Sequence, residues 1–311
     1  MKITNDFDLK KQAEDLGVSI WRTPSFLFIV MGVIIVSAMT ATYFISKKYD
    51  QPEILIGAES LVVAVIFIIG NAIIRQVEEI AKLNKLKSEF VSVASHQLRT
   101  PLSAIRWETE LLLSKLGCGM DEKQCKSVAT INTLATRMTR LVNDLLDVTR
   151  IDQGKLVLRK ESVDVSKIIN ESVDDLLPLA KAKNLQIMVN KKGEIKEIIA
   201  DSARIRVVIE NLLSNSVKYT KTKGKIEVEL FKSDGFVVFS VKDDGVGIPT
   251  QQQKQVFTKF FRSDNAVRYQ TEGTGLGLYI AKSIIEQSGG KIWFQSKEDT
   301  GSVFNFSLPM A

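Results

Sequence analysis

Histidine and cysteine are almost missing from this sequence. His96 is the only histidine among 311 residues, which excludes any metal centre that needs two imidazole ligands. The two cysteines, Cys118 and Cys125, have neither the spacing of a zinc site nor that of a redox pair, so we interpret them as unpaired cytosolic thiols.

Charge of one sign is not concentrated in any part of the chain. The formal net charge is +6, but lysines and arginines are spread along the sequence and mixed with acids. A nucleic-acid-binding protein would gather its basic residues on one surface. We therefore expect a solvated surface near a membrane and no nucleic-acid partner. The length allows about two folded units.

Two stretches, Ser25 to Ile45 and Ile54 to Ile74, contain a single charged residue, Glu59. Each has the roughly 20 residues that an α-helix needs to cross a bilayer. Helices of a soluble core can have the same composition, but the short connecting segment, residues 46–53, favours a membrane hairpin. Glu59 is either a functional charge within the membrane or an acid at its interface.

Basic residues flank this hairpin on both sides, whereas the connecting segment holds only two lysines. The positive-inside rule then places both termini in the cytoplasm of a plasma-membrane protein, with residues 1–24 as a cytoplasmic segment. The flanking residues are Lys2, Lys10, Lys11, Arg22, Arg75, Lys82, Lys85 and Lys87, and the connecting lysines are Lys47 and Lys48.

Residues 75–155 have the pattern of two amphipathic helices. No glycine or proline separates the second apolar stretch from the first of them, so we predict one continuous helix that is bent or weakened locally at Pro101. A second helix is predicted from Asp121. One hairpin buries too little apolar surface to be stable alone, so we predict a homodimer that forms a four-helix bundle. The apolar positions recur at helical or heptad spacing: Leu83, Leu86, Phe90, Val93, Ile131, Leu134, Met138, Leu141, Leu145 and Val148.

His96 lies on the first of these helices. At about 100° per residue, it projects away from the apolar face and toward solvent. Thr100 lies one turn further along, beside it. A single histidine is usually structural, but an outward position within the sequence SHQLRTPL favours a chemical role.

The remaining residues, 156–311, mix helix and strand. They predict an α+β sandwich in which helices cover one face of a mixed sheet. The predicted helix is residues 166–182, and the predicted strands are residues 184–190, 225–232, 236–242, 291–295 and 303–308.

Three motifs in this half have the chemistry of a nucleotide site. In ENLLSNSVKYT, Asn211, Asn215 and Lys218 share one helical face, where amide oxygens suit Mg²⁺ and the ammonium suits phosphate. Asp243 opens DDGVGIP and can accept a hydrogen bond from an exocyclic amine such as that of adenine. Taken alone, ENLLSNSVKYT is typical of a polar helix face, and DDGVGIP is typical of a tight turn.

The third motif, GTGLGLYIAKSII, leads its glycines directly into a helix, whose first N–H groups can bind phosphate. It does not fit the dinucleotide-binding fingerprint, because no βαβ unit surrounds it. About 25 polar residues that include VFTKFFRSD precede it, and they suit a lid over a ligand.

Together, these segments closely resemble the sensor histidine kinase family from about Lys82 onward. SHQLRTPL resembles the phosphoacceptor box, ENLLSNSVKYT the N box, DDGVGIP and GTGLGLYIAK the two glycine boxes, and VFTKFFR the F box. The second half is similar to the ATP-binding fold of gyrase and MutL. The resemblance implies a protein-histidine kinase that uses ATP and Mg²⁺ and transfers phosphate to an aspartate of a separate response regulator.

The resemblance also implies roles for individual residues. His96 would accept the phosphoryl group, Asn215 would coordinate Mg²⁺ beside Asn211, Lys218 would contact phosphate, and Asp243 would bind the adenine amine. The other residues that would shape the ATP site are Tyr219, Gly245, Gly247, Gly273, Thr274, Gly275, Leu276 and Gly277.

One position departs from the family. Its members commonly have an acid directly after the histidine, whereas this chain has Gln97, which cannot act as a base. We expect slower autophosphorylation, since neutral imidazole needs little deprotonation. Thr100 matches the residue that orients water for dephosphorylation of the partner. A phosphatase-biased sensor and an ATP-gated membrane scaffold therefore remain alternatives.

Overall fold

The computed structural model describes residues 20–46, 52–115, 120–193, 197–270 and 273–310. The chain divides into two compact units, residues 1–97 and 98–311, and helix α3 (Pro52–Lys115) runs through the boundary. Cys118, most of the N-terminal segment and most of the predicted connecting loop lie outside the described residues, as does the side chain of Glu59.

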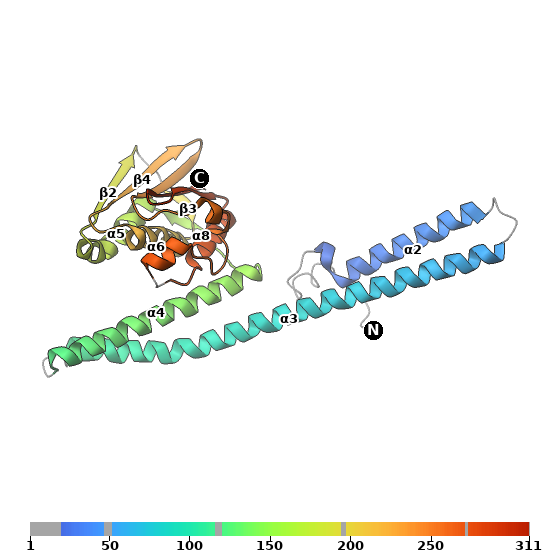
Figure 1. Ribbon diagram of the computed structural model, residues 1–311, viewed down its shortest axis with the longest axis horizontal. Helices are drawn as coiled ribbons and strands as arrows, with labels where there is room; N and C mark the ends of the chain where they lie inside the picture. The colour runs from blue at the N-terminus through green and yellow to red at the C-terminus, as the bar shows by residue number, and fades with distance from the viewer. Residues whose placement is uncertain (1–19, 47–51, 116–119, 194–196, 271–272, 311) are drawn as a thin grey trace. The chain divides into compact units, whose positions relative to one another are not determined.

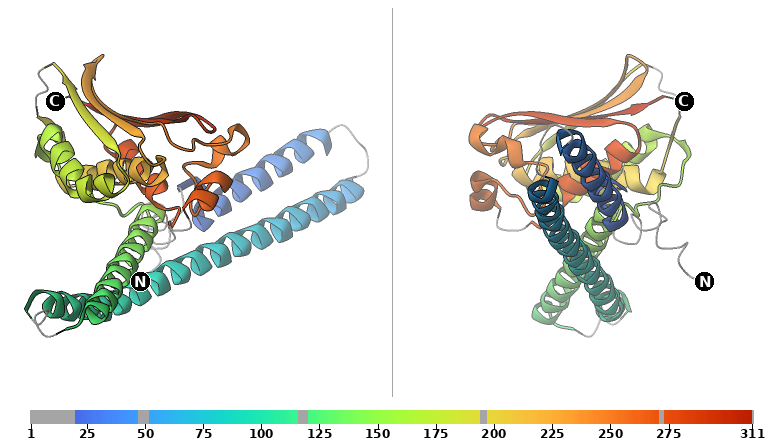
Figure 2. Two further views of the ribbon diagram at one scale, coloured as in Figure 1. Left: turned by 60° about the vertical axis from the view of Figure 1, so that its left-hand side comes forward. Right: turned by 90° about the vertical axis from the view of Figure 1, so that its right-hand side faces the viewer.

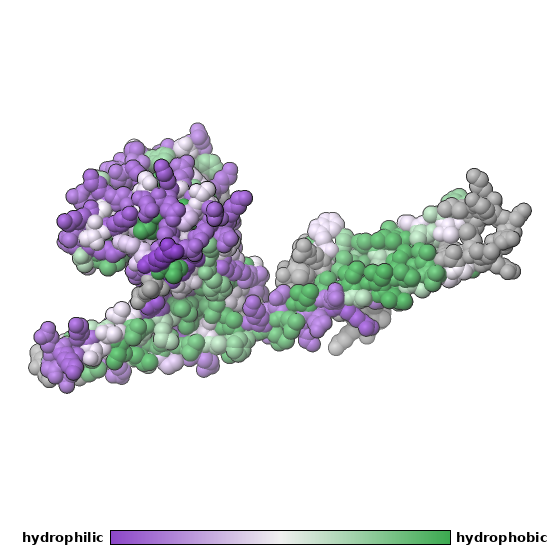
Figure 3. All heavy atoms as spheres, viewed as in Figure 1, coloured by the Kyte–Doolittle hydropathy of each residue, from purple (hydrophilic) through white to green (hydrophobic). Residues whose placement is uncertain are grey.

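The first unit contains two long apolar helices (Figure 1). A short 3-10 turn, η2 (Ile20–Arg22), leads into α2 (Pro24–Ser46), and α3 follows. Both helices are long and apolar enough to cross a membrane, with mean hydropathies of 2.2 and 2.0 over their most apolar stretches. Figure 3 shows hydrophobic residues predominating on α2 and the adjoining part of α3. Their side chains are largely exposed, which is not the environment of a soluble core helix.

One close contact joins α2 to α3. Met31 is 6% exposed and packs over Gly70, where a Cβ atom would clash with its sulfur. The two helices approach each other closely because glycine has no side chain at this point.

Helix α3 is continuous through Pro101, which confirms the predicted single helix, while the local bend or weakening at Pro101 stays a prediction. Helix α4 (Glu122–Asp152) returns alongside the part of α3 that follows Leu98. The start of α4 is fixed by a capping box. Asp121 accepts a hydrogen bond from the Gln124 amide (2.7 Å), and the Gln124 side chain accepts one from the Asp121 amide (2.9 Å). Side-chain hydrogen bonds cross between these helices from Arg99 to Asn143 (2.8 Å) and from Thr109 to Asn132 (3.2 Å).

The rest of the second unit is an α+β sandwich, as predicted. A five-stranded sheet has the order β2-β4-β5-β7-β6, in which β2 and β4 are parallel and the other neighbours antiparallel. Helices α5 (Val165–Ala182), α6 (Ser202–Tyr219) and α8 (Gly277–Gln287) cover one face (Figure 2). The strands are β2 (Gln186–Lys192), β4 (Lys225–Ser233), β5 (Phe236–Asp243), β6 (Lys291–Lys297) and β7 (Gly301–Pro309).

Two details differ from the predicted strands. β2 begins later than expected because Asn184 takes a positive φ of 55° directly after the end of α5, which is incompatible with a strand. A separate pair, β1 (Glu161–Val163) and β3 (Ile198–Ala200), was not predicted, since strands of three residues are too short to show alternation.

The core lies between the sheet and the three helices. Phe239 of β5 and Phe306 of β7 stack with ring centroids 5.0 Å apart, and both are fully buried. Ile205 and Leu212 of α6 are also fully buried. This packing fixes α6 on the sheet and leaves its polar face free for the site.

Candidate nucleotide site

The polar face of α6 carries the first group of site residues. Asp201 caps the helix by accepting a hydrogen bond from the Arg204 amide (3.0 Å). From there, helical periodicity turns Asn211, Asn215 and Lys218 to the side opposite the buried residues, where all three line one cavity with Tyr219.

Asp243 lies at the end of β5 and is 7% exposed. Its carboxylate accepts hydrogen bonds from the amides of Gly245 (3.0 Å) and Ser302 (3.3 Å) and from the Ser216 hydroxyl (3.4 Å). Burial raises its pKa to about 6, although the bonds from Gly245, Ser302 and Ser216 oppose that rise. The result is a desolvated acceptor, ionised at neutral pH and aimed at the cavity.

Two glycines permit close approaches that other residues would prevent. Gly247 has a φ of +61°, and a Cβ atom there would clash with the Lys297 carbonyl of the neighbouring strand. At Gly277, the first residue of α8, a Cβ atom would lie 2.7 Å from the side-chain oxygen of Asn211. Gly247 thus brings the first glycine motif against the end of β6, and Gly277 brings the second glycine motif against the polar face of α6.

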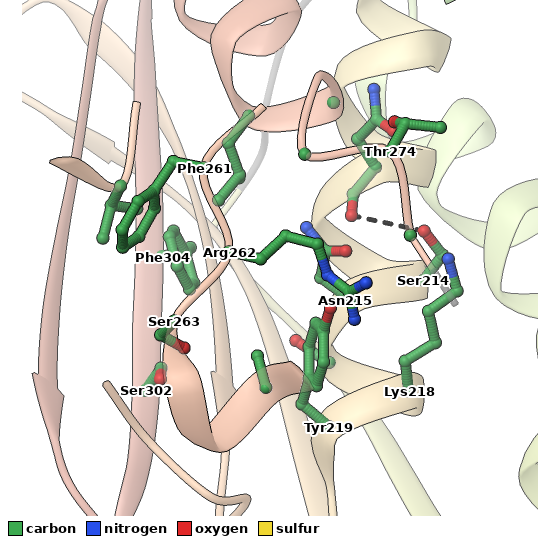
Figure 4. Close-up of a pocket in the computed structure, with 18 of the residues that line it drawn as sticks. Ser214, Asn215, Lys218, Tyr219, Phe261, Arg262, Ser263, Thr274, Ser302 and Phe304 are labelled. Carbon is green, nitrogen blue, oxygen red and sulfur yellow. Dashed lines mark hydrogen bonds between the residues drawn. The ribbon is translucent and has the colours of Figure 1, made fainter. Parts of the chain in front are cut away.

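The cavity has a volume of about 420 Å³, within the range of small-molecule sites. Figure 4 shows Ser302 and Phe304 on one side and Ser214, Lys218 and Thr274 on the other. Ten of the predicted site residues line it: Asn211, Asn215, Lys218, Tyr219, Asp243, Gly247, Gly273, Thr274, Gly275 and Gly277.

Two predicted residues do not line the cavity. Leu276 is 2% exposed and packs in the hydrophobic core, so only its backbone is available to a ligand. Gly245 lies beneath the cavity, where its amide holds Asp243. A Cβ atom at Gly245 would clash with the Tyr219 carbonyl, so this glycine shapes the site from behind.

Several cavity residues were not predicted from the sequence. Helix α4 contributes Arg137, Arg140 and Asp144, and the segment after DDGVGIP contributes Phe261 and Arg262. Burial raises the pKa of Asp144 to about 6, while its contact with Thr274 (3.4 Å) opposes the rise. The arginines on α4 recur at i and i+3, a spacing that could have indicated a basic helix face.

The three predicted residues on α3 are all exposed. His96 and Gln97 belong to the first unit, and Thr100 to the second, which begins at Leu98. Thr100 is not among the residues that line the cavity of its unit. The predicted apolar stripe of the same helix is exposed as well, with Phe90 at 74% and Val93 at 61%, so the orientation of His96 relative to that stripe stays a prediction.

Comparison with known proteins identifies both helical and α+β parts. Residues 86–154 match the "His Kinase A (phospho-acceptor) domain", and residues 200–311 match the "Histidine kinase-, DNA gyrase B-, and HSP90-like ATPase" family.

Similar proteins extend over most of this chain. The circadian input-output histidine kinase CikA of Synechococcus elongatus is 32% identical over 228 residues, which are 73% of this chain and 30% of CikA. The sensor histidine kinase WalK of Bacillus subtilis is 32% identical over 240 residues, or 76% of this chain and 39% of WalK. The chain thus spans well under half the length of these relatives. The crystal structure of full-length ShkA in complex with AMPPNP superposes with a TM-score of 0.59 at 27% identity, covering 72% of this chain and 46% of ShkA.

Proposed function

The chain belongs to the sensor histidine kinases of two-component systems, and from this we propose that it is a membrane-bound, dimeric protein-histidine kinase. It uses ATP to phosphorylate His96. The phosphoryl group then passes to an aspartate of a separate response regulator.

ATP binding is supported by the convergence of three separate motifs on one cavity. This is the observation that carries the proposal. Asp243 is a desolvated acceptor for the adenine amine, and Lys218 and Thr274 lie across the cavity from Ser302, where the phosphates would extend. The similar protein ShkA has been crystallised with AMPPNP, an ATP analogue, which supports ATP as the ligand.

Mg²⁺ fits the same cavity as a partner of the nucleotide. No cluster of three or more His, Cys, Asp or Glu side chains occurs among the described residues. Asn215, with Asn211 one turn away, offers an amide oxygen, and nucleotide phosphates would supply further ligands. The ion would neutralise phosphate charge during transfer.

In the proposed reaction, a nitrogen of the His96 imidazole attacks the γ-phosphorus and ADP leaves. The exposure of His96 allows the imidazole to meet both a nucleotide and a partner protein. A neutral imidazole nitrogen can attack through its lone pair without prior removal of a proton. Catalysis then depends mainly on positioning and charge neutralisation.

Incubation of the protein with γ-labelled ATP tests this function. We expect an acid-labile label that disappears in His96→Gln, with ATP affinity unchanged. ATP binding without a label on any residue would instead favour an ATP-gated scaffold.

Membrane insertion is supported by the exposed apolar surfaces of α2 and α3, which would cost free energy in water. We propose two spans, residues 25–45 and 54–74, with both termini in the cytoplasm. Dimerisation is supported by exposed apolar positions on the hairpin helices, including Ile131, Leu134 and Met138 at 47%, 52% and 51%.

A second activity, dephosphorylation of the response regulator, is favoured by Gln97 and by the exposed Thr100 one turn from His96. If Thr100 orients the attacking water, Thr100→Ala should let the phosphorylated partner persist when kinase and ADP are supplied. Equal decay with both proteins would contradict this role.

A further inference from the structure

The C-terminal end of α6 is the place where three parts of the catalytic domain meet. The last carbonyls of a helix have no partner within it. In α6, each of the last four carbonyls accepts a hydrogen bond from the capping residue or from another part of the domain. Thr220 donates to Ser216 O (2.9 Å), and the Val246 amide of the first glycine motif donates to Tyr219 O (3.2 Å). The next two carbonyls, of Val217 and Lys218, are bound by a lysine side chain.

That lysine is Lys183, at the end of α5. Its Nζ lies 3.0 Å from the Val217 carbonyl and 2.7 Å from the Lys218 carbonyl. A cation at this position also interacts favourably with the negative end of the α6 dipole. Burial lowers the pKa of Lys183, consistent with an ammonium partly enclosed by the domain.

Lys183 also reaches the segment between the two glycine motifs, residues 250–270. Its Nζ lies 5.5 Å from the ring centroid of Tyr269, the last residue of α7 (Asp264–Tyr269). The Tyr269 hydroxyl donates to the Thr220 carbonyl (3.0 Å), so α7 is fixed to the same helix end. Ala266 of α7 lines the cavity from this segment.

We propose that Lys183 is a positioning residue for nucleotide binding. It holds the last turn of α6, which presents Lys218 and Tyr219 to the cavity, and through Tyr269 it holds residues 250–270 over the same cavity. The inference rests on the proposed ATP site and assigns control of that site to a side chain outside it.

The test uses the full chain in lipid nanodiscs, with AMPPNP and Mg²⁺ as the probe. In Lys183→Met, which keeps the aliphatic stem, we expect affinity to fall about tenfold, equivalent to ~1.4 kcal/mol. Amide hydrogen exchange of residues 250–270 without nucleotide should accelerate by a similar factor. Lys183→Arg should restore part of both effects. Lys181→Met, two residues away at an exposed site, should change neither.

Tyr269→Phe and Tyr269→Leu test the second contact and do not depend on the folding of the lysine variant. The phenylalanine keeps the ring under the ammonium but loses the hydrogen bond to Thr220, so its effect should be the smaller. Combining Lys183→Met with Tyr269→Leu should cost less than the sum of the single changes.

A lower melting temperature in Lys183→Met with unchanged affinity and exchange would reduce Lys183 to a structural cap and overturn the proposal. So would normal exchange of residues 250–270 in Tyr269→Leu. Failure of the unmodified protein to bind AMPPNP would overturn the proposed ATP site instead, while the exchange comparison would still judge the contact.

Discussion

The α+β domain buries its apolar side chains, whereas the first half of helix α4 leaves several of them exposed. In the domain, Phe239, Phe306 and Leu212 are completely buried. In the first half of α4, Ile131 and Met138 remain about half exposed, although they recur at heptad spacing. The domain therefore completes its core within one chain, whereas α4 presents a surface that needs to be covered.

The second half of α4 shows how the two regions are joined. Val148, which continues one of the heptad series, is 5% exposed and belongs to the core of the α+β domain. Asp152 then bonds Lys259 (2.6 Å) and Tyr279 (2.9 Å), and Asp147 bonds Arg204 (2.9 Å). One heptad pattern thus serves two partners, and the sequence alone does not indicate where the change occurs.

The largest effect is expected in the self-contained domain, from Asp243→Asn. The asparagine oxygen can keep a hydrogen bond from Gly245 or Ser302, but its amide group cannot accept one from adenine. We expect nucleotide affinity to fall about a hundredfold, the cost of a buried charge-assisted bond. Calorimetric titration with AMPPNP measures it. Asp244→Asn, at the exposed neighbouring residue, is the matched control, and equal losses in both variants would contradict the assignment.

The same substitution should not weaken the fold. The pKa of Asp243 rises from 3.8 to about 6, which corresponds to at most ~3 kcal/mol of unfavourable burial when the group is ionised. Without nucleotide, Asp243→Asn should melt at the same or a higher temperature than the unmodified protein at pH 7.5. A lower melting temperature would show that the carboxylate is needed for packing.

Substitutions in the first half of α4 should weaken dimerisation instead of nucleotide binding. Ile131→Glu combined with Met138→Glu places charges in the predicted dimer contact, and burying them without partners is costly. We expect the dimer dissociation constant to rise about thirtyfold, or ~2 kcal/mol. Sedimentation equilibrium in detergent measures it. The control is Lys126→Glu, at an exposed position of the same helix that is rotated by about a third of a turn around the helix axis from both residues. An unchanged dimer would move the interface elsewhere.

The pH dependence of nucleotide binding is a property of the α+β domain that we do not expect the substitutions at Ile131 and Met138 on α4 to change. The ionised carboxylate of Asp243 is the form that accepts a hydrogen bond from the adenine amine. Nucleotide affinity should therefore fall about tenfold when the pH is lowered from 7.5 to 5, because pH 5 is below the pKa of Asp243, which is about 6. Stability has the opposite sign. Since the folded pKa exceeds the ordinary 3.8, the contribution of Asp243 declines as pH rises from about 4 to 6. Asp144, whose pKa is also raised to about 6, should add to this decline in stability. Because Asp144 also lines the cavity, the change in affinity with pH can be assigned to Asp243 only if it is absent in Asp243→Asn.

What the sequence predicted follows from the range of the interactions involved. Helical periodicity gave the face of α6 and the exposure of His96, because both depend on residues a few positions apart. The contribution of Arg140 and Asp144 to the cavity depends on how α4 packs against the domain. The cap of Lys183 joins residues more than 30 positions apart. No local pattern encodes such contacts.

The smallest effect is expected where the chain departs from its family, at Gln97. The side chain is exposed beside His96 and offers a hydrogen bond but no base. Gln97→Glu would supply a carboxylate that can hold the imidazole and take up its second proton. We expect autophosphorylation to accelerate about fivefold, within the modest end of general base catalysis because neutral imidazole needs little help. Single-turnover labelling at saturating ATP measures the rate.

Gln97→Asn, which keeps the amide and shortens the side chain, is the control and should not accelerate the reaction. The gain in Gln97→Glu should appear in the rate and leave nucleotide affinity unchanged, because the new carboxylate would act on the imidazole of His96 and not on the nucleotide. A rate that stays constant or falls would mean that Gln97 is not what limits phosphorylation. In that case the rate would be set by the positioning of His96, which depends on formation of the proposed dimer. The substitutions at Ile131 and Met138 would then change the rate of autophosphorylation more than any change at Gln97.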